Sequence, residues 1–180
     1  MRHFALSAVG RDRPGIVAAV SEVLLRLELI IEDSQATILR GHFSMVLVVA
    51  ASAEADVDAL RSDLDAVRDR LDLEALALSE LAEVDPASEP APSHMVTLYG
   101  ADHPGIVHAA TAALADRGVD VTDLTTKLAG EDGGEPLYAL MMEVAMPAGG
   151  DESDLAAALE RVGAEQGVEV SLRPLEPDAL

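Results

Sequence analysis

The chain has 180 residues, with 33 acidic and 12 basic side chains and a formal net charge of −21 at pH 7. Such a charge repels phosphate backbones, and two Phe, two Tyr and no Trp leave little for stacking on single-stranded bases. The absence of cysteine excludes disulfides, thiolate metal sites and cysteine catalysis. The apolar runs are far shorter than the ~20 residues that span a bilayer, and the N-terminus shows no secretory signal. We therefore expect a cytoplasmic protein that binds neither nucleic acid nor membrane.

In the first part of the chain, apolar spacing predicts a strand over residues 3–9 and then a helix whose apolar stripe runs from residue 16 to residue 27. Pro14 is expected in the first turn of that helix, where its missing N–H is harmless. Two extended segments follow over residues 30–39 and 43–51, joined by a hairpin connection at residues 40–42. A second amphipathic helix over residues 57–71 and a closing strand over residues 73–81 complete the unit.

Residues 82–93 contain three prolines among small and acidic residues, which predicts a linker. Beyond it the same order of elements returns. We expect a strand over 94–99, a helix over 104–117 capped by Gly118, strands over 121–128 and 137–144 around a turn at 130–134, a helix over 152–166 and a strand over 168–173. The βαββαβ order predicts an α+β fold of two ferredoxin-like domains, each an antiparallel sheet with helices on one face.

A six-residue phrase occurs twice, ninety positions apart: GRDRPG at residues 10–15 and GADHPG at residues 100–105, each followed by Ile-Val. Similarity on this scale indicates that one structural unit was duplicated. The repeat predicts a first domain over residues 1–81, the linker over 82–93, a second domain over 94–174 and a tail over 175–180.

Each copy of the phrase is expected at the corner between a first strand and a first helix. A helix start offers unpaired N–H groups and a positive partial charge, which suit a carboxylate. Gly15 and Gly105 let a ligand approach the backbone, and Asp12 and Asp102 can accept hydrogen bonds from an ammonium group. A free amino acid presents both groups. Two or three charge-assisted hydrogen bonds of ~1.5–3 kcal/mol each suffice for micromolar to millimolar affinity.

Asp33 and Asp123, on the following strand of each unit, can accept the same ammonium hydrogen bonds. The full candidate site comprises Asp12, Arg13, Pro14, Gly15, Ile16, Asp33 and Ser34 in the first unit, and Asp102, His103, Pro104, Gly105, Ile106 and Asp123 in the second.

A purely structural interpretation of these residues stays open. Asp12 can brace the turn, Pro14 and Gly15 can start the helix, and Arg13 and His103 can face solvent. Ile16 and Val17 are expected in the core. His103 and His108 are five residues apart and do not share a helical face, which disfavours a metal site. Catalytic and phosphate-loop motifs are absent from the sequence, so we expect no cofactor and no enzymatic activity.

The segments GRDRPGIV, IEDSQATILRGHFSMVLVV, GADHPGIV and VTDL carry a resemblance to tandem ACT-domain proteins, and among them to the glycine cleavage system repressor-like proteins. It covers about residues 3–81 and 94–173. The resemblance implies a homodimeric regulator that binds a small amino acid, such as glycine. It also implies signalling by contact with a protein, either a transcription regulator or a metabolic enzyme, and not with DNA.

Two alternatives remain: an in-trans regulatory subunit of an amino-acid or one-carbon metabolic enzyme, and a ligand-free dimerisation scaffold. The chain also departs from the family pattern. Ile30 stands where an asparagine is frequent, with Asp120 as its counterpart, and the first helix ends in Leu27-Glu28-Leu29 without the usual glycine. The second unit is closer to the pattern and is expected to hold the better ligand site.

Overall fold

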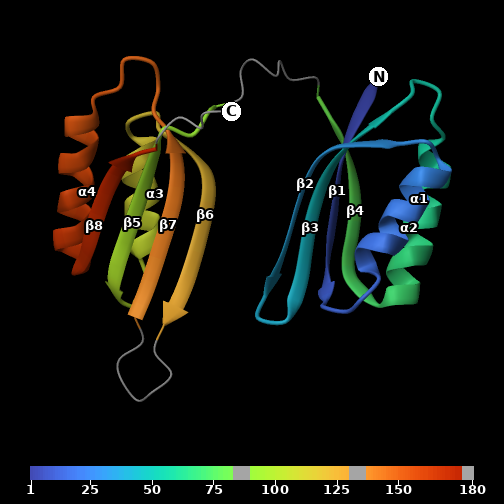
Figure 1. Ribbon diagram of the computed structural model, residues 1–180, viewed down its shortest axis with the longest axis horizontal. Helices are drawn as coiled ribbons and strands as arrows, with labels where there is room; N and C mark the ends of the chain where they lie inside the picture. Colours follow the sequence, from blue (N-terminus) through green and yellow to red (C-terminus); the bar gives the residue numbers. More distant parts are fainter. Residues whose placement is uncertain (83–89, 130–136, 176–180) are drawn as a thin grey trace. The chain divides into compact units, whose positions relative to one another are not determined.

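The computed structural model describes residues 1–82, 90–129 and 137–175. The chain divides into two compact units, residues 1–85 (unit 1) and residues 86–180 (unit 2). Both have the order βαββαβ and a four-stranded antiparallel sheet (Figure 1). The predicted α+β, ferredoxin-like fold is confirmed.

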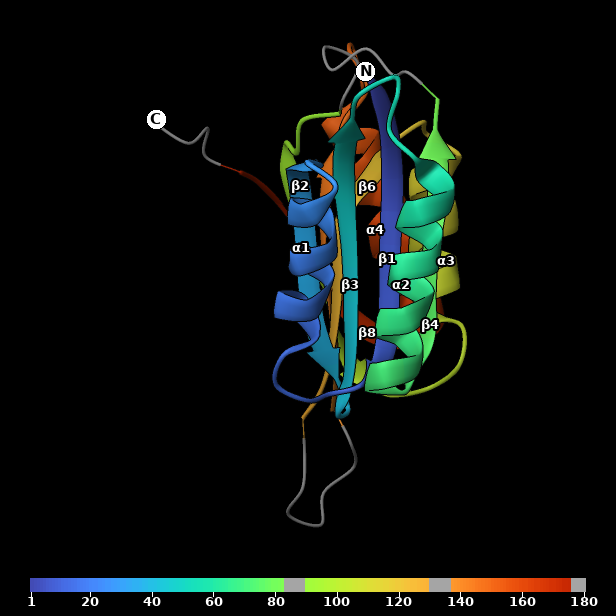
Figure 2. The same cartoon turned by 90° about the vertical axis from the view of Figure 1, so that its right-hand side faces the viewer.

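Unit 1 has a sheet of strand order β2-β3-β1-β4, and both of its helices lie on one face of that sheet (Figure 2). Apolar residues of the helices and of the inner sheet face form its core, with Phe4, Leu6 and Leu24 at most 1% exposed. The elements are β1 (Arg2–Arg11), α1 (Ile16–Arg26), β2 (Ile30–Leu39), β3 (His42–Ala51), α2 (Val57–Leu71) and β4 (Leu73–Leu81).

Unit 2 repeats this arrangement with strand order β6-β7-β5-β8 and a core of its own, in which Leu98, Leu114 and Leu140 are fully buried. The elements are β5 (His94–Ala101), α3 (Ile106–Ala115), β6 (Asp120–Ala129), β7 (Leu137–Ala145), α4 (Glu152–Gln166) and β8 (Val168–Pro174). The predicted turn at 130–134, most of the predicted linker and most of the predicted tail lie outside the described residues. Among the helices that the structure describes, none is long and apolar enough to cross a membrane.

Each first helix begins two residues later than its proline. α1 begins at Ile16 and α3 at Ile106, so the expectation that a proline stands in the first helical turn is wrong. The reason lies in the next residue: Gly15 has φ +98° and Gly105 has φ +112°. A proline followed by such a glycine matches the two central residues of a type II turn. The glycine conformation is therefore what redirects the chain from strand to helix.

The Ile-Val pair after each turn splits between core and surface. Ile16 and Ile106 are 2% and 1% exposed, whereas Val17 and Val107 are 52% and 36% exposed. Consecutive helical residues point about 100° apart, so one neighbour faces the sheet and the other faces outward. The expectation that Val17 packs in the core is wrong, and this exposed valine becomes part of the surface at the corner.

Each first helix ends with the same pair of hydrogen bonds. In α1 the Leu29 N–H donates to the Leu24 carbonyl (2.9 Å) and the Glu28 N–H to the Leu25 carbonyl (3.1 Å). The equivalent bonds after α3 define a Schellman motif with Gly118 in the left-handed conformation, which confirms Gly118 as a C-terminal cap. In unit 1 the position belongs to Glu28, with φ +55°. The missing glycine therefore leaves a side chain in a strained conformation.

Glu28→Gly is expected to stabilise unit 1 by about 0.5–1 kcal/mol. An L-residue in the left-handed region costs about 1–2 kcal/mol, and the greater unfolded-state freedom of glycine offsets part of the gain. Urea unfolding followed by a probe in unit 1 measures the effect. Gly118→Glu in unit 2 is the reciprocal control and should lower stability. A Glu28→Gly protein that unfolds at a lower urea concentration than wild type would contradict the strain.

Candidate functional site

The predicted corner of unit 1 is a loop from Asp12 to Gly15 that runs beside the β2–β3 hairpin. The Asp12 N–H donates to the Gly41 carbonyl oxygen (3.0 Å), and the first helical bond runs from the Ala19 N–H to the Gly15 carbonyl (2.9 Å). The amides of the three residues between, Ile16 to Ala18, belong to a first turn that has no intrahelical acceptor. α1 also has no side-chain cap and no acidic residue in that turn. These N–H groups are free to bind an anionic group.

A surface depression lies over this helix start. Five of the sequence-predicted residues, Asp12 to Ile16, line it together with residues that were not predicted. The full lining is Asp12, Arg13, Pro14, Gly15, Ile16, Val17, Ala18, Ser21, Ile38 and Phe43. The side chain of Ile16 is buried, so this residue can contribute its backbone amide rather than its side chain.

Ile38 and Phe43 form an apolar wall of the depression. They are direct partners in the β2–β3 ladder, beside the turn at Arg40-Gly41. Arg40 and Gly41 both have positive φ, +50° and +81°, as a two-residue type I′ hairpin requires. A tight two-residue turn fixes the register of the two strands. The pairing of Ile38 with Phe43 could therefore be predicted from the sequence once the turn length was known.

Asp33 and Ser34 lie elsewhere in unit 1. Asp33 pairs with Val48, whereas the loop follows the strand end where Arg11 pairs with His42. Six residues of β3 separate the two places, about 20 Å at 3.3 Å per residue. Asp33 instead accepts a hydrogen bond from the Ser34 N–H (2.7 Å) and lines a hollow on the sheet. Within one unit the structure does not bring Asp12 and Asp33 together.

Unit 2 shows the same separation. Asp123 pairs with Glu143, next to a register shift between Val121 and Asp123, while Asp102 follows the end of β5 where Ala101 pairs with Leu137. The counterpart of the hairpin that flanks the unit 1 depression includes residues 130–136, which lie outside the described residues. The site is therefore most fully defined in unit 1.

An aromatic side chain occupies the same place in both units. Phe43 pairs with Gly10 and Tyr138 pairs with Gly100, directly before each loop. Burial raises the pKa of Tyr138, and the charge of the Asp102 carboxylate raises it further, which places the phenol near the predicted acidic residue. The chain has only two Phe and two Tyr, so the presence of one aromatic residue at equivalent positions of both repeats is unusual. This recurrence was the sequence signal that could have identified Phe43 and Tyr138 as neighbours of the loops.

The basic residue of each loop is directed toward the end of the second helix. Arg13 Nη2 lies 4.0 Å from Asp72 Oδ2, at the residue that caps α2. His103 Nε2 lies 2.6 Å from the carbonyl oxygen of Gln166, the last residue of α4, and its Nδ1 lies 3.1 Å from the Pro104 carbonyl oxygen. These interactions raise the pKa of His103, the Gln166 carbonyl contributing most. Both side chains are half-buried and lie beside the end of the second helix of their unit.

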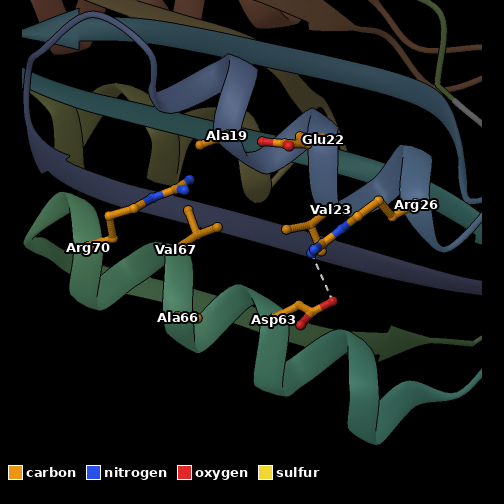
Figure 3. Close-up of a pocket in the computed structure, with 8 residues that line it drawn as sticks. All are labelled: Ala19, Glu22, Val23, Arg26, Asp63, Ala66, Val67 and Arg70. Atoms are coloured by element: carbon orange, nitrogen blue, oxygen red, sulfur yellow. Dashed lines mark hydrogen bonds and ion pairs between the residues drawn. The ribbon is translucent and has the colours of Figure 1, made fainter.

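A second hollow lies between α1 and α2 on the helical face of unit 1 (Figure 3). An ion pair between Arg26 and Asp63 (2.9 Å) crosses it, and Arg70 lines its other end. The hollow contains none of the sequence-predicted residues. Exposed ion pairs of this kind contribute about 1 kcal/mol or less to the free energy of unfolding. We interpret the hollow as part of the packing contact between α1 and α2. Among the described residues, no group of three His, Asp or Glu side chains is arranged to hold a metal ion.

Comparison with known proteins assigns both units to one family. A family model described as the ACT domain matches residues 2–77 and again residues 94–173. A UPF0237 protein from Methanopyrus kandleri is 37% identical over 81 residues, which cover 44% of this chain and 90% of that protein. A relative of this size corresponds to about one unit.

Two solved structures match both units together. A protein of unknown function from Galdieria sulphuraria is 28% identical, with a TM-score of 0.78 over 97% of this chain and 99% of its own. A candidate glycine cleavage system transcriptional repressor has a TM-score of 0.75, 98% coverage of both chains and 17% identity. At that identity the second likeness supports the fold alone.

Proposed function

The chain belongs to the ACT-domain family, and on that basis we propose that it is a non-catalytic regulator that binds a small amino acid and signals through a protein partner. The observation that carries this proposal is the depression over the first turn of α1. It combines an acidic side chain, unpaired helix amides and an apolar wall, the three features that a zwitterion with a small side chain requires.

In this site the ligand carboxylate accepts hydrogen bonds from the amides of residues 16–18, assisted by the positive end of the helix dipole. The ammonium donates to the carboxylate of Asp12, which is exposed at the rim. The side chain of the ligand packs on Ile38 and Phe43. The wall favours a small apolar side chain, whereas glycine, which has none, would bind through its carboxylate and ammonium groups alone. Millimolar to micromolar affinity, about 4–8 kcal/mol, follows from these contacts.

Homodimerisation through β2 would complete the site. β2 is an edge strand with every residue exposed, including Ile30, Ile31, Ile38 and Leu39 at 43–63%. Apolar edges of this kind pair with another strand unless they are blocked. Antiparallel pairing of two copies about a twofold axis at Ala36 sets Ser34 of the partner subunit opposite Ile38 and Asp33 of the partner subunit opposite Leu39, because side chains directly opposite each other lie on the same face. This arrangement reunites Asp33 with the loop from which it is separated within one unit.

The test is thermal unfolding with each of the twenty amino acids. A ligand at 100 times its Kd stabilises the folded state by about 2.7 kcal/mol, which raises the Tm by roughly 5–11 °C in a protein of this size. Asp12→Asn should remove the shift due to unit 1, with Ser52→Ala, in the loop before α2, as a folding-neutral control. If no amino acid changes the Tm or gives heat on titration, the chain is a ligand-free scaffold and the proposal fails.

Mixing of variants tests whether the site is shared between subunits. In an Asp102→Asn background, Asp12→Asn and Asp33→Asn homodimers should each lose binding at unit 1. Heterodimers of the two variants should regain one intact site, because each chain supplies the carboxylate that the other lacks. After random exchange about a quarter of the unit 1 sites should bind. No recovery, with binding intact in the wild-type dimer, would place the whole site in one subunit.

The protein partner is expected to be a transcription regulator, as the name of the similar solved structure suggests, and the alternative is an amino-acid or one-carbon metabolic enzyme. The negative charge of the chain disfavours a direct DNA contact. Affinity purification from the native cell, with and without the amino acid found by thermal shift, distinguishes the two partner classes. A partner whose recovery does not change with ligand would contradict sensing.

A further inference from the structure

His103 has an unusual pair of neighbours. Its two ring nitrogens both face backbone carbonyl oxygens, Nε2 that of Gln166 at 2.6 Å and Nδ1 that of Pro104 at 3.1 Å. A neutral imidazole carries one N–H and can donate to one of these oxygens, which leaves the lone pair of the other nitrogen facing a carbonyl. An imidazolium donates to both. The geometry is therefore that of the protonated ring.

The surroundings favour the same protonation state. Gln166 is the last residue of α4, where carbonyl oxygens without intrahelical partners carry partial negative charge. From the ring's own loop come the Pro104 carbonyl and the carboxylate of Asp102. Among the described residues, Asp102 is the charged side chain whose field acts on the ring. Partial desolvation opposes these effects, and the balance raises the pKa of His103.

The loop and α4 meet at a second point. A Cβ at Gly105 would lie 3.3 Å from Gln166 Oε1, so Gln166 adjoins the loop through its side chain as well as its carbonyl. The corresponding tie in unit 1 runs from Arg13 to Asp72 and depends on a guanidinium, which stays charged throughout the physiological range. The two units thus hold the same loop with cations of different acidity.

We propose that His103 is a proton-dependent tie that fixes the Asp102–Gly105 loop to the end of α4, and that unit 1 has no such dependence because Arg13 replaces the histidine. Below the ordinary imidazole pKa of about 6.5 the tie is complete. As the pH rises through the higher pKa of the folded state, one of the two hydrogen bonds is lost and the loop loosens. The consequence for ligand affinity rests on the proposed function, whereas the tie itself does not.

A pH titration of the full chain, followed by NMR, tests the tie without any ligand. The His103 ring should titrate above about 6.5, and the backbone amide of Gly105 should shift with the same midpoint. The Gly15 amide of unit 1, in the same spectrum, should show no transition at that midpoint. A His103 ring that titrates at or below about 6.5, or a Gly105 amide that ignores it, overturns the proposal.

Variants separate the tie from a general effect of pH. His103→Gln should lower the Tm of unit 2 more at pH ~6, where the ring donates both hydrogen bonds, than at pH ~9, where it donates one, on either side of the raised pKa. His103→Arg should keep the tie at both values, as Arg13 does, and His108→Gln is the matched control on α3. A His103→Gln deficit that is equal at both pH values overturns the proposal. A glycine titration adds the functional arm: a pH-dependent tie without glycine binding sustains this inference while counting against glycine as the ligand.

Discussion

Ile106→Ala is expected to destabilise unit 2 by about 2–4 kcal/mol, whereas Val107→Ala should change its stability by about 0.5 kcal/mol or less. Ile106 is 1% exposed and packs in the core cluster with Val96, Leu98 and Leu114. Removing its branched side chain takes away buried apolar surface and leaves a cavity. Val107 is 36% exposed at the next helical position, so its truncation leaves no cavity.

Urea unfolding combined with hydrogen exchange resolved by segment measures these changes in unit 2. Ile16→Ala and Val17→Ala form the matched pair in unit 1, where Ile16 is 2% and Val17 is 52% exposed. Equal losses for the two members of a pair would contradict the division between core and surface. Because Val17 lines the depression, Val17→Ala should also weaken amino-acid binding without unfolding unit 1.

The bounds of the second helix in each unit were predictable because local sequence signals mark both the start and the end of that helix. α2 and α4 coincide with their predicted ranges, 57–71 and 152–166. Asp56 accepts from the Ala59 N–H and Asp151 from the Ser153 N–H, and a left-handed residue, Asp72 or Gly167, follows each helix. Side-chain caps and left-handed ends are properties of neighbouring residues, so the sequence alone specifies them.

The start of each first helix was placed incorrectly because proline has two favourable positions with the same φ. It suits both the first turn of a helix and the second position of a type II turn. The conformation of the following glycine decides between them, and a glycine adopts either sign of φ. Apolar spacing did not resolve this choice, and it also overstated the burial of Val17.

The part of the candidate site that is contiguous in the sequence was predictable. The part that depends on the register of paired strands was not. The segment Asp12 to Ile16 forms one lining of the depression, as a local motif can. Ile38 and Phe43 join it only through the ladder of β2 and β3, and Asp33 is displaced from it by the same ladder. The partner of His103 lies 63 residues away at the end of α4. Contacts of this range arise from tertiary packing and leave no local pattern.

Gly100→Val is expected to destabilise unit 2 by about 3 kcal/mol or more. β5 and β8 approach so closely at this residue that a Cβ would lie 2.7 Å from Val168 Cγ1 and 3.1 Å from Val168 Cα. The side chain of Val168 can rotate away, but its backbone is held in the sheet and cannot. Overpacking against fixed atoms costs about 1–3 kcal/mol and sometimes more, and valine adds two methyl groups beyond the Cβ that already collides.

Gly10→Val provides the matched change in unit 1, where a Cβ would lie 2.7 Å from Leu73 Cδ2 and 3.2 Å from Leu73 Cα. Segment-resolved hydrogen exchange should show faster exchange in unit 2 alone for Gly100→Val and in unit 1 alone for Gly10→Val, since each unit has its own core. The repeated first glycine would then be explained by the approach of two strands, while Gly15 and Gly105 form the turn. If Gly100→Val unfolds at the wild-type urea concentration, the close approach of β5 and β8 does not explain the glycine. A role of Gly100 in ligand binding would then be the explanation to test.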